Sequence, residues 1–156
     1  MREEKMKTKI LKNYTYNGLG FPIKLQNVTM VMLDGEWNPQ INVRKIADNA
    51  IRELPYQSER FSGDQIKFIR TYFEMSLRKF ASEVVSESHN AVAKWEKFGP
   101  LSTNMDENIE SMLRLYIIDK VSTNTKKQAQ EFIKAFRKIR GMTFLKKIPT
   151  PLTIEG

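Results

Sequence analysis

The pattern of apolar and polar positions changes along the chain, and each change predicts a different kind of element. From residue 14 to residue 37, aromatic and β-branched residues alternate with polar ones and are interrupted by glycine, which is typical of short strands. Asp34-Gly35 predicts a tight turn within this segment. The period then becomes helical, with Asn42 as the expected cap of a helix that ends at Pro55.

Two helices joined by a short turn are predicted in the middle of the chain. Ser76 can cap the first, whose apolar residues share one face: Leu77, Phe80, Ala81 and Val84. Ser88 can cap the second, in which Val92 and Trp95 face inward. Ala81 is small enough for the two helices to cross closely. We interpret this segment as a helix-turn-helix, although a helical hairpin with a solvated polar face has the same pattern.

The outward face of the second helix carries residues that suit the major groove of DNA. Asparagine can bond to the edge of adenine through two hydrogen bonds, lysine can donate to O6 and N7 of guanine, and histidine can contact a base or a phosphate. The candidates for reading bases are therefore His89, Asn90 and Lys94.

Further amphipathic segments flank this pair. Ser62 and Gln65 form a capping-box pattern at the start of a helix, and another helix is expected to begin near Asp106. A last helix is expected from about Thr125 to Arg140, with one apolar and one basic side. Its apolar side is either a dimer contact or a cover for the core, and its basic side either contacts phosphate or is solvated.

Charge is distributed unevenly along the 156 residues, which carry a net charge of +8. Residues 62–121 hold 8 basic and 9 acidic groups, whereas residues 122–156 hold 8 basic and 2 acidic groups. The overall excess favours a polyanionic partner, but it lies mainly outside the helix-turn-helix.

The residue types that are missing exclude several kinds of site. Without cysteine the chain has no disulfide framework, no thiol nucleophile and no cysteine-held zinc. His89 is the single histidine, so a histidine-rich metal cluster is excluded as well. No phosphate-binding glycine loop or conspicuous carboxylate pair suggests catalysis, and we expect neither an enzyme nor a cofactor. Without a long apolar run or a signal-peptide pattern, we expect a cytoplasmic protein.

Four segments carry motifs in an order and spacing typical of one protein family. They are Gly18-Leu-Gly-Phe-Pro-Ile-Lys-Leu-Gln-Asn-Val28, Phe61-Ser-Gly-Asp-Gln-Ile-Lys-Phe-Ile-Arg70, the helix pair Phe80–Glu96 with its ending Asn-Ala-Val-Ala-Lys-Trp-Glu-Lys, and Leu113-Arg114-Leu115. Through them the chain resembles the MqsA-like (YgiT-type) antitoxins of bacterial toxin-antitoxin pairs, which end in a Xre/Cro-type helix-turn-helix. The likeness extends from Tyr16 to Ile118.

The resemblance implies roles for individual residues. Asn90 and Lys94 match the two base-contacting positions of the second helix, and Ser88 and His89 lie where that helix meets the groove. Phosphate contacts are expected from Arg78, Lys79, Ser88 and Lys97. Trp95 and Glu96 are expected to hold the fold, while Arg70 either pairs with a carboxylate or contacts phosphate.

One departure from the family is large. Its members usually hold zinc with two Cys-x-x-Cys pairs in the N-terminal module, whereas the corresponding segment here, Val31–Trp37, has no cysteine. The module must therefore be held by packing. In the zinc-bearing relatives this module binds the toxin, so its remodelling bears directly on toxin binding.

Together these patterns predict a mainly α fold, in which a lambda-repressor-like helix-turn-helix domain at residues 61–121 follows a small β-hairpin-plus-helix module at residues 14–60. Residues 1–13 are expected to be flexible, and residues 122–156 to form a basic helix and tail. The predicted function is a dimeric, sequence-specific repressor on an inverted-repeat operator, acting as an antitoxin that binds a toxin through residues 14–60. The alternative is a protein-interaction module or a solitary regulator without a toxin partner.

Overall fold

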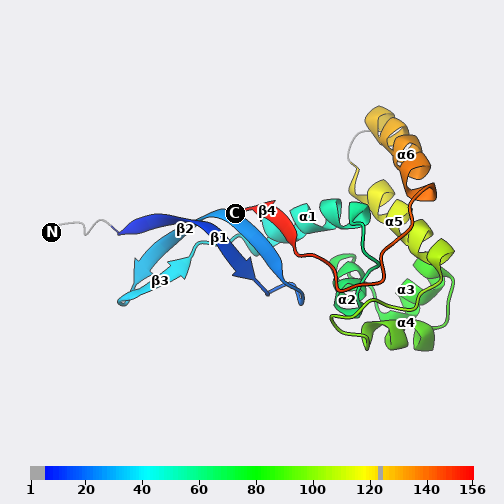
Figure 1. Cartoon of the computed structure of the whole chain (residues 1–156), viewed down its shortest axis with the longest axis horizontal. Helices are drawn as coiled ribbons and strands as arrows, with labels where there is room; N and C mark the ends of the chain where they lie inside the picture. The colour runs from blue at the N-terminus through cyan, green and yellow to red at the C-terminus, as the bar shows by residue number, and fades with distance from the viewer. Residues whose placement is uncertain (1–5, 123–124) are drawn as a thin grey trace. The chain divides into compact units, whose positions relative to one another are not determined.

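The chain is an α+β protein made of two compact units (Figure 1). The computed structural model describes residues 6–122 and 125–156. One unit comprises Met1–Asn49 with Pro151–Gly156, and the other comprises Ala50–Thr150. The described residues form six α-helices and a four-stranded sheet, with 47% of the chain helical and 22% in strands. The predicted mainly α fold is therefore wrong.

The sheet is larger than predicted because both ends of the chain join it. β1 (Thr8–Tyr16) begins inside the segment expected to be flexible, and β4 (Leu152–Glu155) lies in the expected C-terminal tail. The long strand β2 (Ile23–Leu33) pairs with β1 in antiparallel register. It also pairs with β3 (Glu36–Pro39), antiparallel, and with β4, parallel. Strands that come from opposite ends of the chain thus flank one central strand.

Local sequence signals set the turn and the first helix of this unit. Asp34 and Gly35 have φ angles of 49° and 80°, and a hairpin turn with two positive φ values confirms the predicted Asp-Gly turn. Asn42 accepts a hydrogen bond from the Lys45 amide at 3.1 Å and so caps α1 (Val43–Glu53), as predicted. The alternating residues Ile23 and Leu25 are buried.

The second unit is helical. Its elements are η1 (Leu54–Tyr56), α2 (Gly63–Tyr72), α3 (Leu77–Phe80), η2 (Ala81–Val85), α4 (His89–Glu96), α5 (Glu107–Val121) and α6 (Thr125–Arg140). Ser62 and Gln65 form the predicted capping box of α2. The hydroxyls of Ser76 and Ser88 each accept a backbone amide hydrogen at 3.1 Å, from Lys79 and Ala91, so both predicted caps are confirmed.

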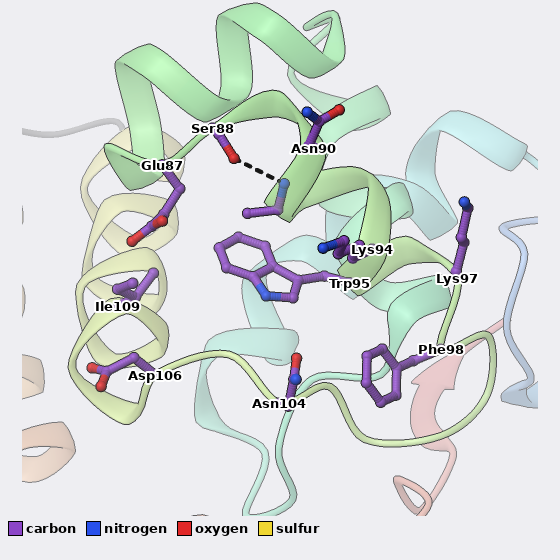
Figure 2. Close-up of a pocket in the computed structure, with 11 residues that line it drawn as sticks. Glu87, Ser88, Asn90, Lys94, Trp95, Lys97, Phe98, Asn104, Asp106 and Ile109 are labelled. Atoms are coloured by element: carbon purple, nitrogen blue, oxygen red, sulfur yellow. Dashed lines mark hydrogen bonds between the residues drawn. The ribbon is translucent and has the colours of Figure 1, made fainter.

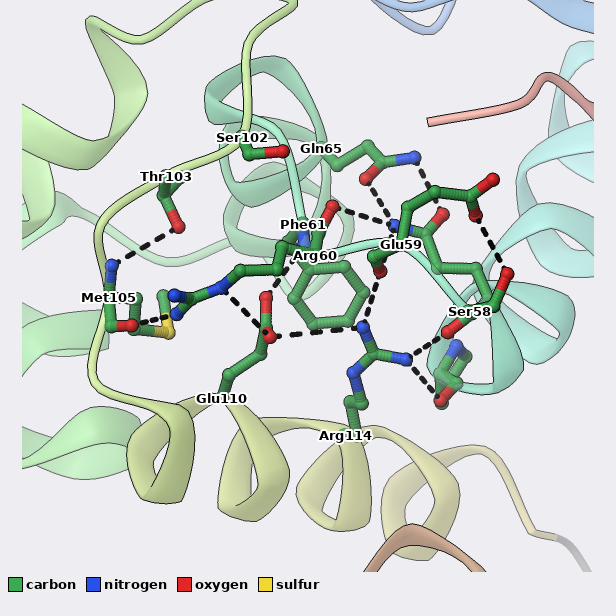
Figure 3. A network of polar contacts seen from close by, with 12 residues as sticks. Ser58, Glu59, Arg60, Phe61, Gln65, Ser102, Thr103, Met105, Glu110 and Arg114 are labelled. Atoms are coloured by element: carbon green, nitrogen blue, oxygen red, sulfur yellow. Dashed lines mark hydrogen bonds and ion pairs between the residues drawn. The ribbon is translucent and has the colours of Figure 1, made fainter. Parts of the chain in front are cut away.

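A buried polar network joins α5 to the segments on either side of it (Figure 3). Arg114 and Glu110 are both 0% exposed. Arg114 donates hydrogen bonds to the carbonyls of Pro55, Gln57 and Glu59, at 3.1, 2.5 and 2.7 Å. These bonds hold residues 54–60, the connector between α1 and α2, in the helical unit. The observed division between the units therefore precedes residue 50 and not residue 61.

Glu110 is the acidic centre of this network. Its Oε1 accepts the Phe61 amide at 2.6 Å, and its Oε2 lies 3.5 Å from Arg60 Nε and 3.9 Å from Arg114 Nη2. Arg60 also donates to the Met105 carbonyl. Burial raises the pKa of the Glu110 carboxyl, against the opposing effects of the Phe61 amide and the two guanidinium groups.

The C-terminal segment of the helical unit is fastened to the same network. The Phe144 ring lies 3.8 Å from the Arg114 guanidinium, and the Thr150 amide donates to Glu59 Oε1 at 3.1 Å. Burial alone would raise the pKa of Glu59, but the hydrogen bonds from Thr150 hold it below its ordinary value. Residues 141–150 contain no helix or strand, but these contacts fasten them to the helical unit.

Gly63, at the start of α2, packs directly on the end of α4. A Cβ atom at this position would lie 2.5 Å from the Trp95 carbonyl oxygen and 2.6 Å from the Gly99 amide nitrogen. Both are backbone atoms, which cannot move aside as a side-chain tip can. We expect Gly63→Ala to lower the free energy of unfolding by about 1–3 kcal/mol in urea denaturation. A matched Gly141→Ala change, whose Cβ would lie 3.8 Å from its nearest neighbour, the Lys138 carbonyl oxygen, is expected to be far milder.

Candidate nucleic-acid interface

The helix α4 presents one face to solvent because its other face is buried. Val92 is 0% exposed and Trp95 is 6% exposed. Before α4, the chain turns at Ser86, whose φ of 52° is left-handed, and the Glu87 amide donates to the Ala81 carbonyl at 2.9 Å. The turn between the two helices therefore begins at Ser86, directly after the π-helical turn η2. This geometry fixes which side chains of α4 face outward.

Asn90 and Lys94 lie four residues apart on α4 and are both exposed. Neither side chain has a hydrogen-bond or ion-pair partner among residues 6–122 and 125–156. Their donor and acceptor groups are thus available to a ligand. His89, at the first position of the helix, is only half-buried.

The predicted phosphate-contacting residues are also on the surface. Arg78 and Lys79 are exposed on α3, and Lys97 is exposed at the C-cap of α4. Ser88 is exposed, and its hydroxyl oxygen accepts the Ala91 amide. Its O–H hydrogen remains able to donate, so capping α4 and contacting a phosphate are compatible.

An open groove of about 650 Å³ runs beside α4 (Figure 2). Its lining includes the predicted site residues Asn90, Lys94 and Lys97, but not His89, Arg78 or Lys79. The other lining residues are Glu87, Ser88, Ala91, Trp95, Phe98, Asn104, Asp106 and Ile109. The sequence-predicted residues are therefore divided: some line this groove, Arg78 and Lys79 lie on α3, and His89 lies at the start of α4 outside the groove lining.

The groove also contains residues that the sequence did not single out. Asn104 and Asp106 come from the loop before α5, and Asp106 caps that helix by accepting the Asn108 amide at 2.8 Å. The loop returns to the groove because the Thr103 amide donates to the Phe61 carbonyl at 3.0 Å. With Glu87, Asp106 gives the groove two carboxylates in addition to its lysines.

An ion pair between Arg70 and Glu96 fastens α4 to α2. Arg70 Nε and Nη2 each donate to a Glu96 carboxylate oxygen at 2.9 Å, and Arg70 Nη1 donates to the Met75 carbonyl at 3.0 Å. This two-bond ion pair joins α2 to the C-terminal end of α4 and neutralises Glu96. The structural roles predicted for Trp95 and Glu96 are confirmed, and Arg70 takes the carboxylate-pairing role of its two alternatives.

No protein-family model matches the chain, and no curated protein or solved structure matches it either. The resemblance to MqsA-like antitoxins stays a prediction that rests on the residues alone. In the part of the chain that the structure describes, no group of three or more His, Cys, Asp or Glu residues is placed to hold a metal ion. None of its helices combines the length and apolar character needed to cross a membrane.

Acidic residues lie close to the candidate interface. Glu83 and Glu87 are exposed in and just after η2. Burial and the charges of Glu83 and Asp119 raise the pKa of Tyr116 on α5. The local field is thus mixed, because Lys97 lines the same groove as Glu87, while Arg78 and Lys79 lie outside its lining.

Proposed function

We propose that the chain is a sequence-specific DNA-binding repressor that inserts α4 into the major groove. The observation that carries this proposal is the arrangement of α4 itself. Val92 and Trp95 anchor one face, while Asn90 and Lys94 project from the other with no partner among the described residues. Asparagine and lysine are side chains that discriminate base edges in the major groove.

Phosphate contacts complete the proposed interface. Arg78 and Lys79 on α3 and Lys97 after α4 are exposed cations on the elements that precede and end the candidate base-reading helix. Contacts to phosphates fix the orientation of a protein on the duplex, while contacts to bases set its sequence preference. His89 and Ser88, at the N-terminal end of α4, are then the residues nearest the entry to the groove.

We further propose a dimer on an inverted repeat, with the antitoxin role that the family resemblance suggests. Two copies of α4 would enter successive major grooves about 34 Å apart. The unit that contains β1, β2 and β3 is the proposed toxin-binding part, since residues 14–60 correspond to the toxin-binding module of the family. Autoregulation of the operon follows from these two roles.

Single substitutions separate base reading from phosphate contact. Asn90→Ala is expected to cost about 1–3 kcal/mol on the cognate duplex and little on a scrambled one. Lys79→Ala is expected to weaken binding to both duplexes alike. The measurement is a fluorescence anisotropy titration against the DNA upstream of the coding sequence and a scrambled duplex. Lys67→Ala, an exposed change on α2, is the matched control. Equal losses on both duplexes for Asn90→Ala would contradict base reading.

A protein-interaction module is the second candidate function. The observation that favours it is the pair of carboxylates, Glu87 and Asp106, that line the groove beside α4. A partner with its own cations could bind there, whereas phosphates would be repelled. Charge reversal distinguishes the two: Glu87→Lys is expected to strengthen DNA binding under the repressor proposal and to weaken a protein partner under the alternative.

A further inference from the structure

The helices α5 and α6 form a surface that is separate from α4. Leu115, Ile118, Ala135 and Ile139 are buried in a common apolar cluster with Phe144, so α6 does cover part of the core. Two of its apolar residues do not take part in this packing: Ile133 is 53% exposed and Phe136 is 40% exposed. The apolar side that the sequence predicts for α6 is therefore wider than the core it covers.

Residues from α5 extend this apolar surface. Met112 is 61% exposed, and it lines a groove of about 180 Å³ together with Phe136. The remaining lining is Asn108, Ser111, Leu115, Ile139 and Arg140. Small-molecule sites usually measure about 300–1,000 Å³, so this groove is too small for one. It fits an inserted apolar side chain.

Arg140 lines this groove, and Arg137 lies three residues before it on α6. Arg137 and Arg140 occupy the face of α6 that carries Ile133 and Phe136, at spacings of three and four residues. Neither arginine has an ion pair with another described residue. No carboxylate is among the described residues that line the groove. The surface is thus an apolar groove beside two uncompensated cations.

We propose that this α5–α6 groove, lined by Met112 and Phe136 and flanked by Arg137 and Arg140, binds an acidic amphipathic helix of a partner protein. Apolar side chains one turn apart on that helix enter the groove, and its carboxylates pair with the two arginines. A second copy of this chain is a poorer occupant, because the same groove lining on that copy would add cations and no carboxylate to pair with them. Duplex DNA is poorer as well, because it would leave the exposed apolar residues without an apolar partner.

The test uses the full chain and two designed helical peptides of about 15 residues. Both have leucine at the same helical spacing, but one has glutamate and the other lysine at the remaining polar positions. Fluorescence anisotropy is expected to show saturable binding of the acidic peptide and at least about tenfold weaker binding of the basic one. Phe136→Ala and Arg137→Glu are each expected to weaken the acidic peptide by about tenfold.

Matched variants control for general effects on an exposed surface. Leu101→Ala removes an apolar side chain that is 54% exposed elsewhere on the helical unit, and Lys67→Glu reverses an exposed charge on α2. Both are expected to bind the acidic peptide within about twofold of the unchanged protein. Thermal melting of every variant reports whether it is folded.

Several results would overturn the proposal. If the acidic peptide does not saturate the protein up to about 1 mM, or if both peptides bind equally, an acidic partner is ruled out. If the control variants lose as much affinity as Phe136→Ala, the α5–α6 groove is not the binding site. A dimer in sedimentation equilibrium that Phe136→Glu dissociates would identify a second copy as the occupant. Loss of duplex binding by Arg137→Glu with unchanged peptide binding would make this a DNA contact.

Discussion

Replacing Arg114 with methionine is expected to lower the free energy of unfolding by about 3–5 kcal/mol, the usual cost of breaking a buried ion pair. The Arg114 guanidinium lies between the rings of Phe61 and Phe144, at 4.5 and 3.8 Å. It supplies the hydrogen bonds to the connector carbonyls and one of the two cations beside Glu110. Methionine fills similar volume but leaves these acceptors without a donor.

Urea denaturation followed by circular dichroism measures this loss. Lys67→Met makes the same kind of change at an exposed position of α2 and is expected to shift stability by no more than about 0.5 kcal/mol. A loss below about 1 kcal/mol for Arg114→Met would mean that the network is not held together by this arginine.

The Arg114→Met deficit is expected to depend on pH through Glu110. Burial already raises the pKa of Glu110 above its ordinary 4.5, and removing a neighbouring cation raises it further. A carboxyl with a raised pKa in the folded state stabilises the fold below its unfolded pKa and loses that contribution as pH rises through the folded pKa. The difference in free energy of unfolding between Arg114→Met and the unchanged protein is therefore expected to be smaller at about pH 4 than at pH 7. A deficit that grew on acidification would contradict this assignment.

DNA binding by the proposed dimer is expected to weaken by about a thousandfold between about 50 and 200 mM salt. Each protomer offers three cations for phosphates, namely Arg78, Lys79 and Lys97, so a dimer would neutralise about six phosphates and release their counterions. The measurement is a series of anisotropy titrations at increasing salt concentrations.

Variants assign the salt dependence to particular side chains. Lys79→Ala removes one phosphate contact from each protomer and is expected to make the slope of log K against log salt shallower by about 2. Lys67→Ala, on α2, is expected to leave the slope unchanged. A slope near zero for the unchanged protein would show that phosphates are not the ligands of these cations.

Features that depend on neighbouring residues could be predicted from the sequence. The caps at Ser62, Ser76 and Ser88 each bond to an amide three residues ahead, so the short motif contains all the necessary information. The outward placement of Asn90 and Lys94 likewise follows from helical spacing alone.

Features that depend on distant residues could not be predicted in this way. β4 pairs with β2 across more than a hundred residues, so no local pattern in Leu152–Glu155 names its partner. In β1 the lysines obscured the alternation of apolar and polar residues that marks a strand. One of them, Lys9, packs over the Trp37 ring, with its Nζ atom 4.3 Å from the ring centroid. The fold class was wrong because these two strands were missed.

The candidate site shows the same limit. Asn104 and Asp106 line the groove from a loop that bonds to the Phe61 carbonyl, a contact that their sequence does not indicate. The burial of Arg114 could have been suspected from the sequence, because this arginine lies between two leucines of an amphipathic helix. A charged residue in such a setting is buried only when paired, and a search for partners would have led to Glu110.

Selection of bound sequences from a library of random DNA duplexes tests the central claim most directly, because it requires no knowledge of the operator. If α4 reads bases, we expect enrichment of an inverted repeat whose half-sites are about 10 base pairs apart, with Asn90→Ala losing the preference at one position of each half-site. Enrichment of no sequence by the unchanged protein, or the same motif from Asn90→Ala, would contradict the assignment of α4 as the base-reading helix.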